Sequence, residues 1–192
     1  MIMIAWDIDD VLNDLMGLWF ENQWLKEYPE CNLTYADLKE NPPYKLLGVK
    51  KEDYLKSLDR FRLKRYLHDV VPVPEILEWF LKYGDRFRHM ALTSVPLSCA
   101  HVSAFWLFKY FGNWIRTFHL VPSKREEDLP LYDYSKGEYL NWLGKVNILI
   151  DDNETNIKSA DSYGIKGILM PKPWNSQTKT VKEVLDLLID VE

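Results

Sequence analysis

Two groups of aspartates stand at the ends of short apolar runs, where carboxylates could carry out chemistry. Asp7, Asp9 and Asp10 follow the first run in IAWDIDDVLND, and Asp151 and Asp152 directly follow VNILI. Residues i and i+2 of a strand point to the same side, so Asp7 and Asp9 are expected to face one pocket. Open parallel sheets bind ligands at the carboxyl ends of their strands, and both groups are expected to converge there.

Converging carboxylates repel one another, and this predicts a bound cation. Two unit charges about 4 Å apart repel by about 4 kcal/mol at an effective dielectric constant of about 20. Oxygen ligands without a nearby histidine or cysteine favour Mg²⁺ over Zn²⁺. Each aspartate could instead cap the helix that follows its strand. Two acidic groups at equivalent strand ends, with LTS (residues 92–94) at the end of a third strand, favour a functional site.

The elements that must position these aspartates follow an α/β pattern. Short apolar runs, too brief for buried helices, predict strands at residues 1–6, 89–94, 117–122, 146–150 and 166–170. Their near-continuous apolarity predicts a three-layer, Rossmann-like parallel sheet with helices on both faces. Proline, glycine and apolar periodicity predict those helices at residues 72–84, 98–112, 135–144, 153–164 and 180–191.

A long insertion separates the first two predicted strands, and it has far more residues than one connecting helix needs. Helical patterns occur within it at residues 15–28, 34–37 and 50–63, the second opening with a capping-box pair, Thr34 and Asp37. We therefore interpret residues 13–71 as a helical cap inserted after the first strand, and residues 1–12 and 72–192 as the core domain.

The composition restricts the class of protein. The 192 residues, 47% of them hydrophobic, can bury one substantial core, and the net charge of -5 argues against binding nucleic acid through a broad basic surface. Two distant cysteines indicate neither a disulfide framework nor a zinc site. No apolar run approaches the roughly 18 residues that span a bilayer, and MIMIAW is too short for a signal peptide. We expect a soluble cytoplasmic protein.

Three of these segments resemble the motifs of a known family. DIDDVLND resembles the first motif of the haloacid dehalogenase-like (HAD) phosphatases, MALTS the second and ILIDDNETN the acidic fourth. Within that superfamily, the DVLND continuation, the Thr93–Ser94 pair, the double aspartate and the position of the cap are most similar to the 5'(3')-deoxyribonucleotidases. The resemblance covers the predicted sheet portion of the chain.

The resemblance implies catalytic roles for four of these residues. Asp7 would be the nucleophile that attacks phosphorus and forms an aspartyl-phosphate. Asp9 would protonate the leaving oxygen and then activate water, a division that the chemistry itself needs because an alkoxide leaves poorly without a proton. Thr93 would donate a hydrogen bond to a phosphoryl oxygen, assisted by the backbone at Ser94.

The resemblance also implies how Mg²⁺ would be held. Its ligands would be Asp7, the main-chain carbonyl of Asp9 and the Asp151/Asp152 pair, with Asp152 favoured as the direct ligand. Asp10 stands where the family usually has glycine, and it could be a helix cap or an outer-sphere partner of the metal.

The third motif of the family, a lysine that balances the phosphate charge, has two candidates. Lys124 follows the third predicted strand, whereas Lys136 opens the helix that leads into the fourth motif. We favour Lys136, and at least one of the two must be a solvated lysine.

Aromatic residues of the predicted cap are candidates for substrate binding. Trp19 and Trp24, with Phe20, follow the nucleophile loop, and in the resembling nucleotidases cap aromatics pack against the base. The same rings could instead form the cap's own small core. Trp174 and Asn175, after the last predicted strand, are expected near the same rim.

The sequence thus favours a magnesium-dependent phosphomonoester hydrolase that acts on a small phosphorylated substrate, with a nucleoside or deoxynucleoside monophosphate preferred. Two other enzymes remain open: a 3'-phosphatase on nucleic-acid ends and a small sugar-phosphate phosphatase. A non-catalytic binding module on the same scaffold is a further alternative. Such a module would be expected to lose a nucleophile, and every acidic position is present here.

Overall fold

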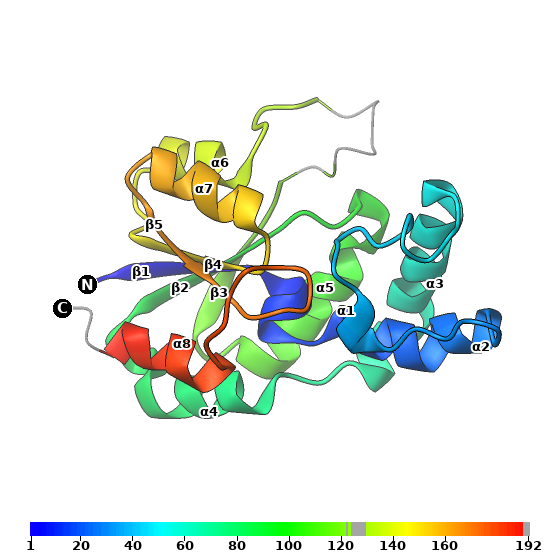
Figure 1. The fold of residues 1–192 in the computed structure, drawn as a ribbon. Helices are drawn as coiled ribbons and strands as arrows, with labels where there is room; N and C mark the ends of the chain where they lie inside the picture. The colour runs from blue at the N-terminus through cyan, green and yellow to red at the C-terminus, as the bar shows by residue number, and fades with distance from the viewer. Residues whose placement is uncertain (122, 124–129, 190–192) are drawn as a thin grey trace.

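A parallel β-sheet lies at the centre of the computed structural model, which describes residues 1–121, 123 and 130–189 (Figure 1). Within these residues the sheet has five strands in the order β3-β2-β1-β4-β5. The strands are β1 (Met3–Trp6), β2 (Arg88–Thr93), β3 (Ile115–Leu120), β4 (Ile148–Asp151) and β5 (Lys166–Leu169). Every neighbouring pair is parallel, which confirms the predicted sheet.

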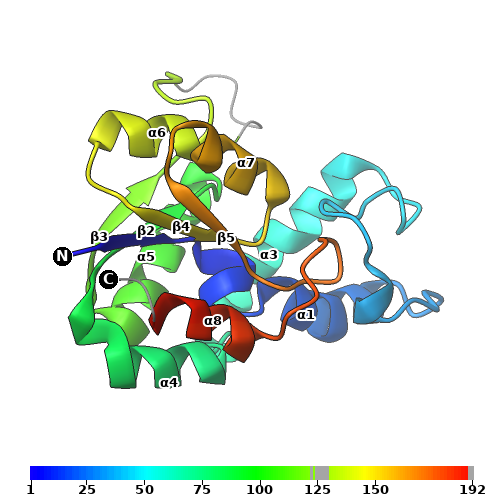
Figure 2. The same ribbon diagram turned by 60° about the vertical axis from the view of Figure 1, so that its left-hand side comes forward.

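Helices cover both faces of the sheet, as predicted (Figures 1 and 2). One face carries α4 (Pro74–Tyr83), α5 (Leu97–Phe111) and α8 (Val181–Ile189), and the other carries α6 (Lys136–Leu143) and α7 (Glu154–Ser162). Ile4 and Trp6 of β1 belong to the larger apolar cluster, and Ala5 between them belongs to the cluster on the opposite face. Burial on both faces explains why the strands read as continuous apolar runs.

The insertion between β1 and α4 is helical. It contains α1 (Leu15–Trp19), a π-helical segment (Phe20–Trp24), α2 (Leu25–Glu27), a short 3₁₀ turn (Tyr35–Asp37) and α3 (Lys51–Asp69). The Thr34/Asp37 capping box is present at that turn. Helix α3 is longer than its sequence pattern indicated, and it packs beside α5 of the core. Within the described ranges, no helix has the length and apolarity needed to cross a membrane.

The chain leaves and re-enters the sheet layer at adjacent points. Asn13 forms an isolated antiparallel bridge with Pro72, and the amide of Val73 donates to the carbonyl oxygen of Leu12 at 3.0 Å. These contacts lie where the sequence suggested the limits of the cap. The division into a core and a cap remains our interpretation.

Candidate functional site

The order of the strands brings the predicted site residues together. Because β1 lies between β2 and β4, their carboxyl ends place Asp7, Thr93 and the Asp151–Asp152 pair at one edge of the sheet. This edge borders a cavity of about 170 Å³. Its lining includes Asp7, Asp9, Asp10, Thr93, Ser94, Lys136, Asp152, Asn153 and Asn156, together with Met16, Asn41, Tyr54, Leu58 and Arg62 from the insertion.

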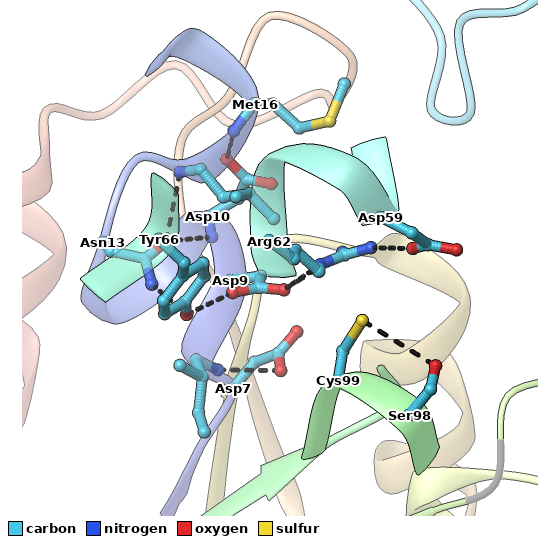
Figure 3. A network of polar contacts seen from close by, with 12 residues as sticks. Asp7, Asp9, Asp10, Asn13, Met16, Asp59, Arg62, Tyr66, Ser98 and Cys99 are labelled. Atoms are coloured by element: carbon cyan, nitrogen blue, oxygen red, sulfur yellow. Dashed lines mark hydrogen bonds and ion pairs between the residues drawn. The ribbon is translucent and has the colours of Figure 1, made fainter. Parts of the chain in front are cut away.

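The loop after β1 has an unusual backbone at Asp10, the position at which the resembling family usually has glycine. Asp10 has φ 64° and is the one non-glycine residue with a positive φ among those that the structure describes. Aspartate tolerates this left-handed region better than most residues, although glycine is favoured there. The Oδ1 atom of Asp10 accepts from the amide of Met16 at 2.9 Å, in the first turn of α1 (Figure 3). This contact favours the helix-cap role over the metal role.

Three carboxylates form a cluster that could hold a cation. One oxygen each of Asp7, Asp151 and Asp152 lie within 4.8 Å of one another. The Nζ atom of Lys136, which is 1% exposed, lies 2.9 Å from Asp7 Oδ2 and 2.7 Å from Asp151 Oδ2. Of the two candidate lysines, Lys136 therefore lies at the site, whereas Lys124 falls outside the described residues.

One lysine does not balance the charge of this cluster. Burial raises the pKa of Asp7 well above its usual range, with Lys136 opposing and Asp151 reinforcing the shift. Burial, and then the charge of Asp151, raises the pKa of Asp152 to about 8. The Lys136 pKa is raised by Asp151 and Asp7 in spite of the opposing effect of burial. The donor set is all oxygen, and the protein alone disfavours the negative forms of Asp7 and Asp152, so the cluster fits a hard divalent cation such as Mg²⁺.

The two adjacent aspartates have different surroundings. Asp151 is fully buried, and its oxygens accept hydrogen bonds from the amide of Asn153 at 2.9 Å and from Lys136 at 2.7 Å. Asp152 borders the cavity, and its Oδ2 accepts from Nε1 of Trp174 at 2.8 Å. The side-chain amide of Asn175 donates to the main-chain oxygen of Asp152, also at 2.8 Å. Trp174 and Asn175 thus lie at the site, as the sequence suggested.

Thr93 has a buried hydroxyl group that no described residue pairs with. Its Oγ1 is buried, and among the described residues it has no hydrogen-bond partner, although Thr93 lines the cavity beside Ser94. An unsatisfied buried hydroxyl costs roughly 1–3 kcal/mol, so a native structure is expected to use it. A ligand oxygen in the cavity would satisfy it.

Asp9 is held by two residues of α3 that sequence reasoning missed. Arg62 donates through Nε and Nη2 to Asp9 Oδ2 at 3.2 and 3.1 Å, and the hydroxyl of Tyr66 donates to Asp9 Oδ1 at 2.6 Å (Figure 3). The helical spacing contained a signal, because Arg62 follows Tyr54 and Leu58 on the buried face of α3. An arginine on a buried face requires an acidic partner.

The two tryptophans expected to contact the substrate lie instead in the interior of the insertion. Trp19 and Trp24 are 0% and 1% exposed, and their ring centroids lie 5.2 Å apart in the interior of the insertion. Neither lines the cavity, and Nε1 of Trp19 donates to Ser57 of α3 at 3.1 Å. The rings pack the helices of the insertion together, because so small a unit needs large side chains for its core. This is the alternative that the sequence left open.

Solved structures share this fold. A HAD-like family hydrolase from Streptococcus pneumoniae superposes with a TM-score of 0.65 at 11% identity, covering 98% of this chain and 97% of that one. A Thermotoga maritima protein assigned as a beta-phosphoglucomutase superposes with a TM-score of 0.59 at 17% identity, covering 100% of both chains. A Haemophilus somnus protein assigned as a phosphoglycolate phosphatase gives 0.59 at 12% identity over 97% of both. At these identities the likeness establishes a HAD-like fold alone.

Comparison of the sequence with protein-family models and with curated proteins gives no match.

Proposed function

We propose that this chain is a magnesium-dependent phosphomonoester hydrolase that works through an aspartyl-phosphate on Asp7. One observation carries the proposal: Asp7, Lys136 and Thr93 line the same small cavity, Lys136 Nζ lies 2.9 Å from Asp7 Oδ2, and the Thr93 hydroxyl has no partner among the described residues. A nucleophile, a cation and a free donor are the groups that transfer of a phosphoryl dianion requires. The HAD-like fold and the hydrolases that share it support the same chemistry.

The first half-reaction forms a bond between an oxygen of Asp7 and phosphorus while the bond from phosphorus to the ester oxygen breaks. Asp9 gives a proton to that ester oxygen, which leaves as an alcohol. Lys136 and the Thr93 hydroxyl contact the phosphoryl oxygens and stabilise the charge that develops on them. In the second half-reaction Asp9 takes a proton from water, the water attacks phosphorus, and inorganic phosphate departs from Asp7.

Of the three clustered carboxylates, Asp7 and Asp152 would hold Mg²⁺, together with the main-chain carbonyl of Asp9 that the family resemblance implies as a ligand. When bound, the ion neutralises the repulsion between the nucleophile and the phosphate. Asp152 borders the cavity, whereas Asp151 is occupied by Lys136 and neighbouring amides, so we propose Asp152 as the direct ligand.

A second cavity indicates where the leaving group would lie. Its volume is about 450 Å³, and it shares Asn41, Asp152 and Asn153 with the first cavity. The half-buried Trp174 lines it and could stack with a base, a contact worth about 1–3 kcal/mol. We therefore propose a nucleoside or deoxynucleoside monophosphate as the preferred substrate. A small sugar phosphate is the second candidate, because two proteins with this fold are assigned to sugar-phosphate and phosphoglycolate chemistry.

The test is a screen of phosphate release with Mg²⁺ and with chelator. The panel contains nucleoside 5'- and 3'-monophosphates, sugar phosphates, phosphoglycolate and 3'-phosphorylated oligonucleotides, and the control is Asp7→Asn. We expect Mg²⁺-dependent release that Asp7→Asn abolishes while its circular dichroism spectrum stays native. Turnover by Asp7→Asn would refute the covalent mechanism. Phosphate binding without any turnover by the wild type would favour the non-catalytic module.

A further inference from the structure

The side chain of Asp9 is held by residues of helix α3 (Figure 3), and this helix lies outside the sheet layer (Figure 1). Arg62 and Tyr66 are four residues apart and so project from the same face of that helix. The side chains of Arg62 and Asp9 are 10% and 11% exposed, and Tyr66 is fully buried. Both oxygens of one carboxylate are therefore held by a single helix, at the edge of the cavity.

The direction of each hydrogen bond in this network can be assigned. Oδ1 of Asn13 accepts from the amides of Leu15 at 3.0 Å and Asp10 at 3.3 Å, so its Nδ2 faces Tyr66 and donates to the phenol oxygen at 2.8 Å. Because the phenol oxygen accepts from Asn13, its own hydrogen points to Asp9 Oδ1. Tyr66 is consequently a donor with a fixed direction.

Among the described residues, these hydrogen bonds leave one lone-pair position on Asp9 for a transferable proton. A carboxylate has about four lone-pair positions, and the two N–H groups of Arg62 fill those of Oδ2. Tyr66 fills one position of Oδ1. The remaining lone pair of Oδ1 is the position at which Asp9 can hold a proton for the leaving group.

The support for Tyr66 continues into the core. Its ring packs edge-on against Trp106 of α5, with centroids 5.9 Å apart and an interplanar angle of 75°. Nε1 of Trp106 donates to the main-chain oxygen of Val70, just after α3 ends, at 2.8 Å. The end of α3 is thus attached to the core, and displacement of α3 would move the groups that orient Asp9.

We propose that Arg62 and Tyr66 are positioning residues that orient Asp9 for proton transfer to the leaving oxygen. This inference rests on the proposed function. It assigns to α3 a part in bond breaking, in addition to any contact that it makes with the substrate. In the step concerned, the ester oxygen takes the proton from Asp9 Oδ1 as its bond to phosphorus breaks, and Arg62 and Tyr66 keep their own protons.

The experiment compares two leaving groups at one active site. The value of kcat/KM reports the steps up to departure of the leaving group, in which p-nitrophenolate needs no proton and an alkoxide does. The kcat/KM values of the wild type, Tyr66→Phe and Arg62→Lys are measured with p-nitrophenyl phosphate and with the alkyl phosphate that the wild type hydrolyses best. Arg65→Lys is the matched control, because Arg65 lies on the same helix and pairs with Asp69.

We expect Tyr66→Phe and Arg62→Lys to lower kcat/KM for the alkyl phosphate by roughly 10- to 100-fold, as misdirected general acid catalysis should. The value for p-nitrophenyl phosphate should change by less than about threefold on the same basis, and Arg65→Lys should match the wild type with both substrates. Equal losses on both substrates, or no loss on either, would overturn the inference.

Two further outcomes are informative. If Arg62→Lys does not fold, Tyr66→Phe decides the matter alone, since it removes a single oxygen and keeps the ring that packs on Trp106. A wild type that hydrolyses neither substrate would refute the proposed function, and the inference with it. A wild type that hydrolyses both, with variants insensitive to the leaving group, would refute the inference alone.

Discussion

Replacement of Asp152 by asparagine should stabilise the metal-free protein. Asp152 is 5% exposed and lies beside Asp151, and burial with that neighbouring charge raises its pKa to about 8. In the unfolded chain the pKa of an aspartate is about 3.9. The folded state must therefore keep a proton on Asp152 at pH 7 that the unfolded state releases, and asparagine carries no such requirement.

The size of the effect follows from the difference between the two pKa values. At pH 7 the unfolded group lies about three pH units above its pKa, and each unit corresponds to about 1.4 kcal/mol, which gives an upper limit of ~4 kcal/mol. Asp7 and Asp10 belong to the same charged region, and neutralising one carboxyl group lowers the pKa of the others. We expect a gain of at least about 1 kcal/mol, which is ~2–4 °C in Tm for a chain of this length.

The dependence on pH has a defined sign. Because the folded state binds the additional proton between about pH 4 and pH 8, the free energy of unfolding of the wild type falls as pH rises through that range. The contribution from Asp152 is thus favourable near pH 4 and lost by about pH 8. The advantage of Asp152→Asn over the wild type should therefore grow from pH 5 to pH 8.

Urea unfolding at several pH values, in chelator and in Mg²⁺, measures these quantities. Mg²⁺ at a hundredfold excess over its Kd should stabilise the wild type by about 2.7 kcal/mol, and Asp152→Asn by less because one ligand is neutral. The variant's advantage in unfolding free energy, present in chelator, should therefore become smaller or reverse in Mg²⁺. A variant less stable than the wild type in chelator at pH 8, or an equal gain from Mg²⁺ in both proteins, would refute the reasoning.

Three other substitutions test separate parts of the site. Lys136→Ala should lower kcat/KM by two or more orders of magnitude, which is about 3 kcal/mol in the barrier. Lys145→Ala, at an exposed position, is the control and should leave kcat/KM unchanged. Similar mild effects of both substitutions would mean that Lys136 is not the lysine of the third motif. Trp174→Phe removes the donor to Asp152 and should weaken Mg²⁺ binding by about tenfold or more in titration calorimetry, and unchanged affinity would exclude this support. Trp24→Ala should lower the free energy of unfolding by about 3–5 kcal/mol. When assayed below the Tm of the variant, kcat/KM for p-nitrophenyl phosphate should stay near the wild-type value. A catalytic loss without destabilisation would instead support a contact between Trp24 and the substrate.

The sheet could be predicted from sequence because its signals are local and mutually consistent. Continuous apolar runs indicate strands buried on both faces, and the carboxyl ends of adjacent parallel strands must share one edge. Asp7, Thr93 and Asp152 could be brought together on that basis alone, since each follows or ends a strand. The left-handed backbone of Asp10 could not be derived from the residue type, because aspartate adopts it only in a particular turn.

The buried positions of Trp19 and Trp24 show the limit of that reasoning. Their spacing placed them on a helix near the nucleophile, but it did not determine which face of the helix met the cavity and which met α3. That choice depends on how the insertion packs, and the packing buries both rings while Tyr54 and Leu58 of α3 border the cavity. Aromatic side chains bury large apolar areas, so a small helical unit uses them in its own core even when they lie near a site in the sequence.

The contact between α3 and Asp9 lay beyond the sequence for a different reason. A buried arginine predicts a buried carboxylate partner, but it does not identify which carboxylate, and the chain offers many. Only the packing of α3 selects Asp9, the one acid that must both give and take a proton in the proposed mechanism. If that pairing were merely structural, an apolar pair could replace it at little cost in stability. A charged donor and a directed phenol on the carboxylate that we propose to transfer the proton are therefore better explained by control of its orientation, which would connect the insertion to the proposed chemistry at the edge of the sheet.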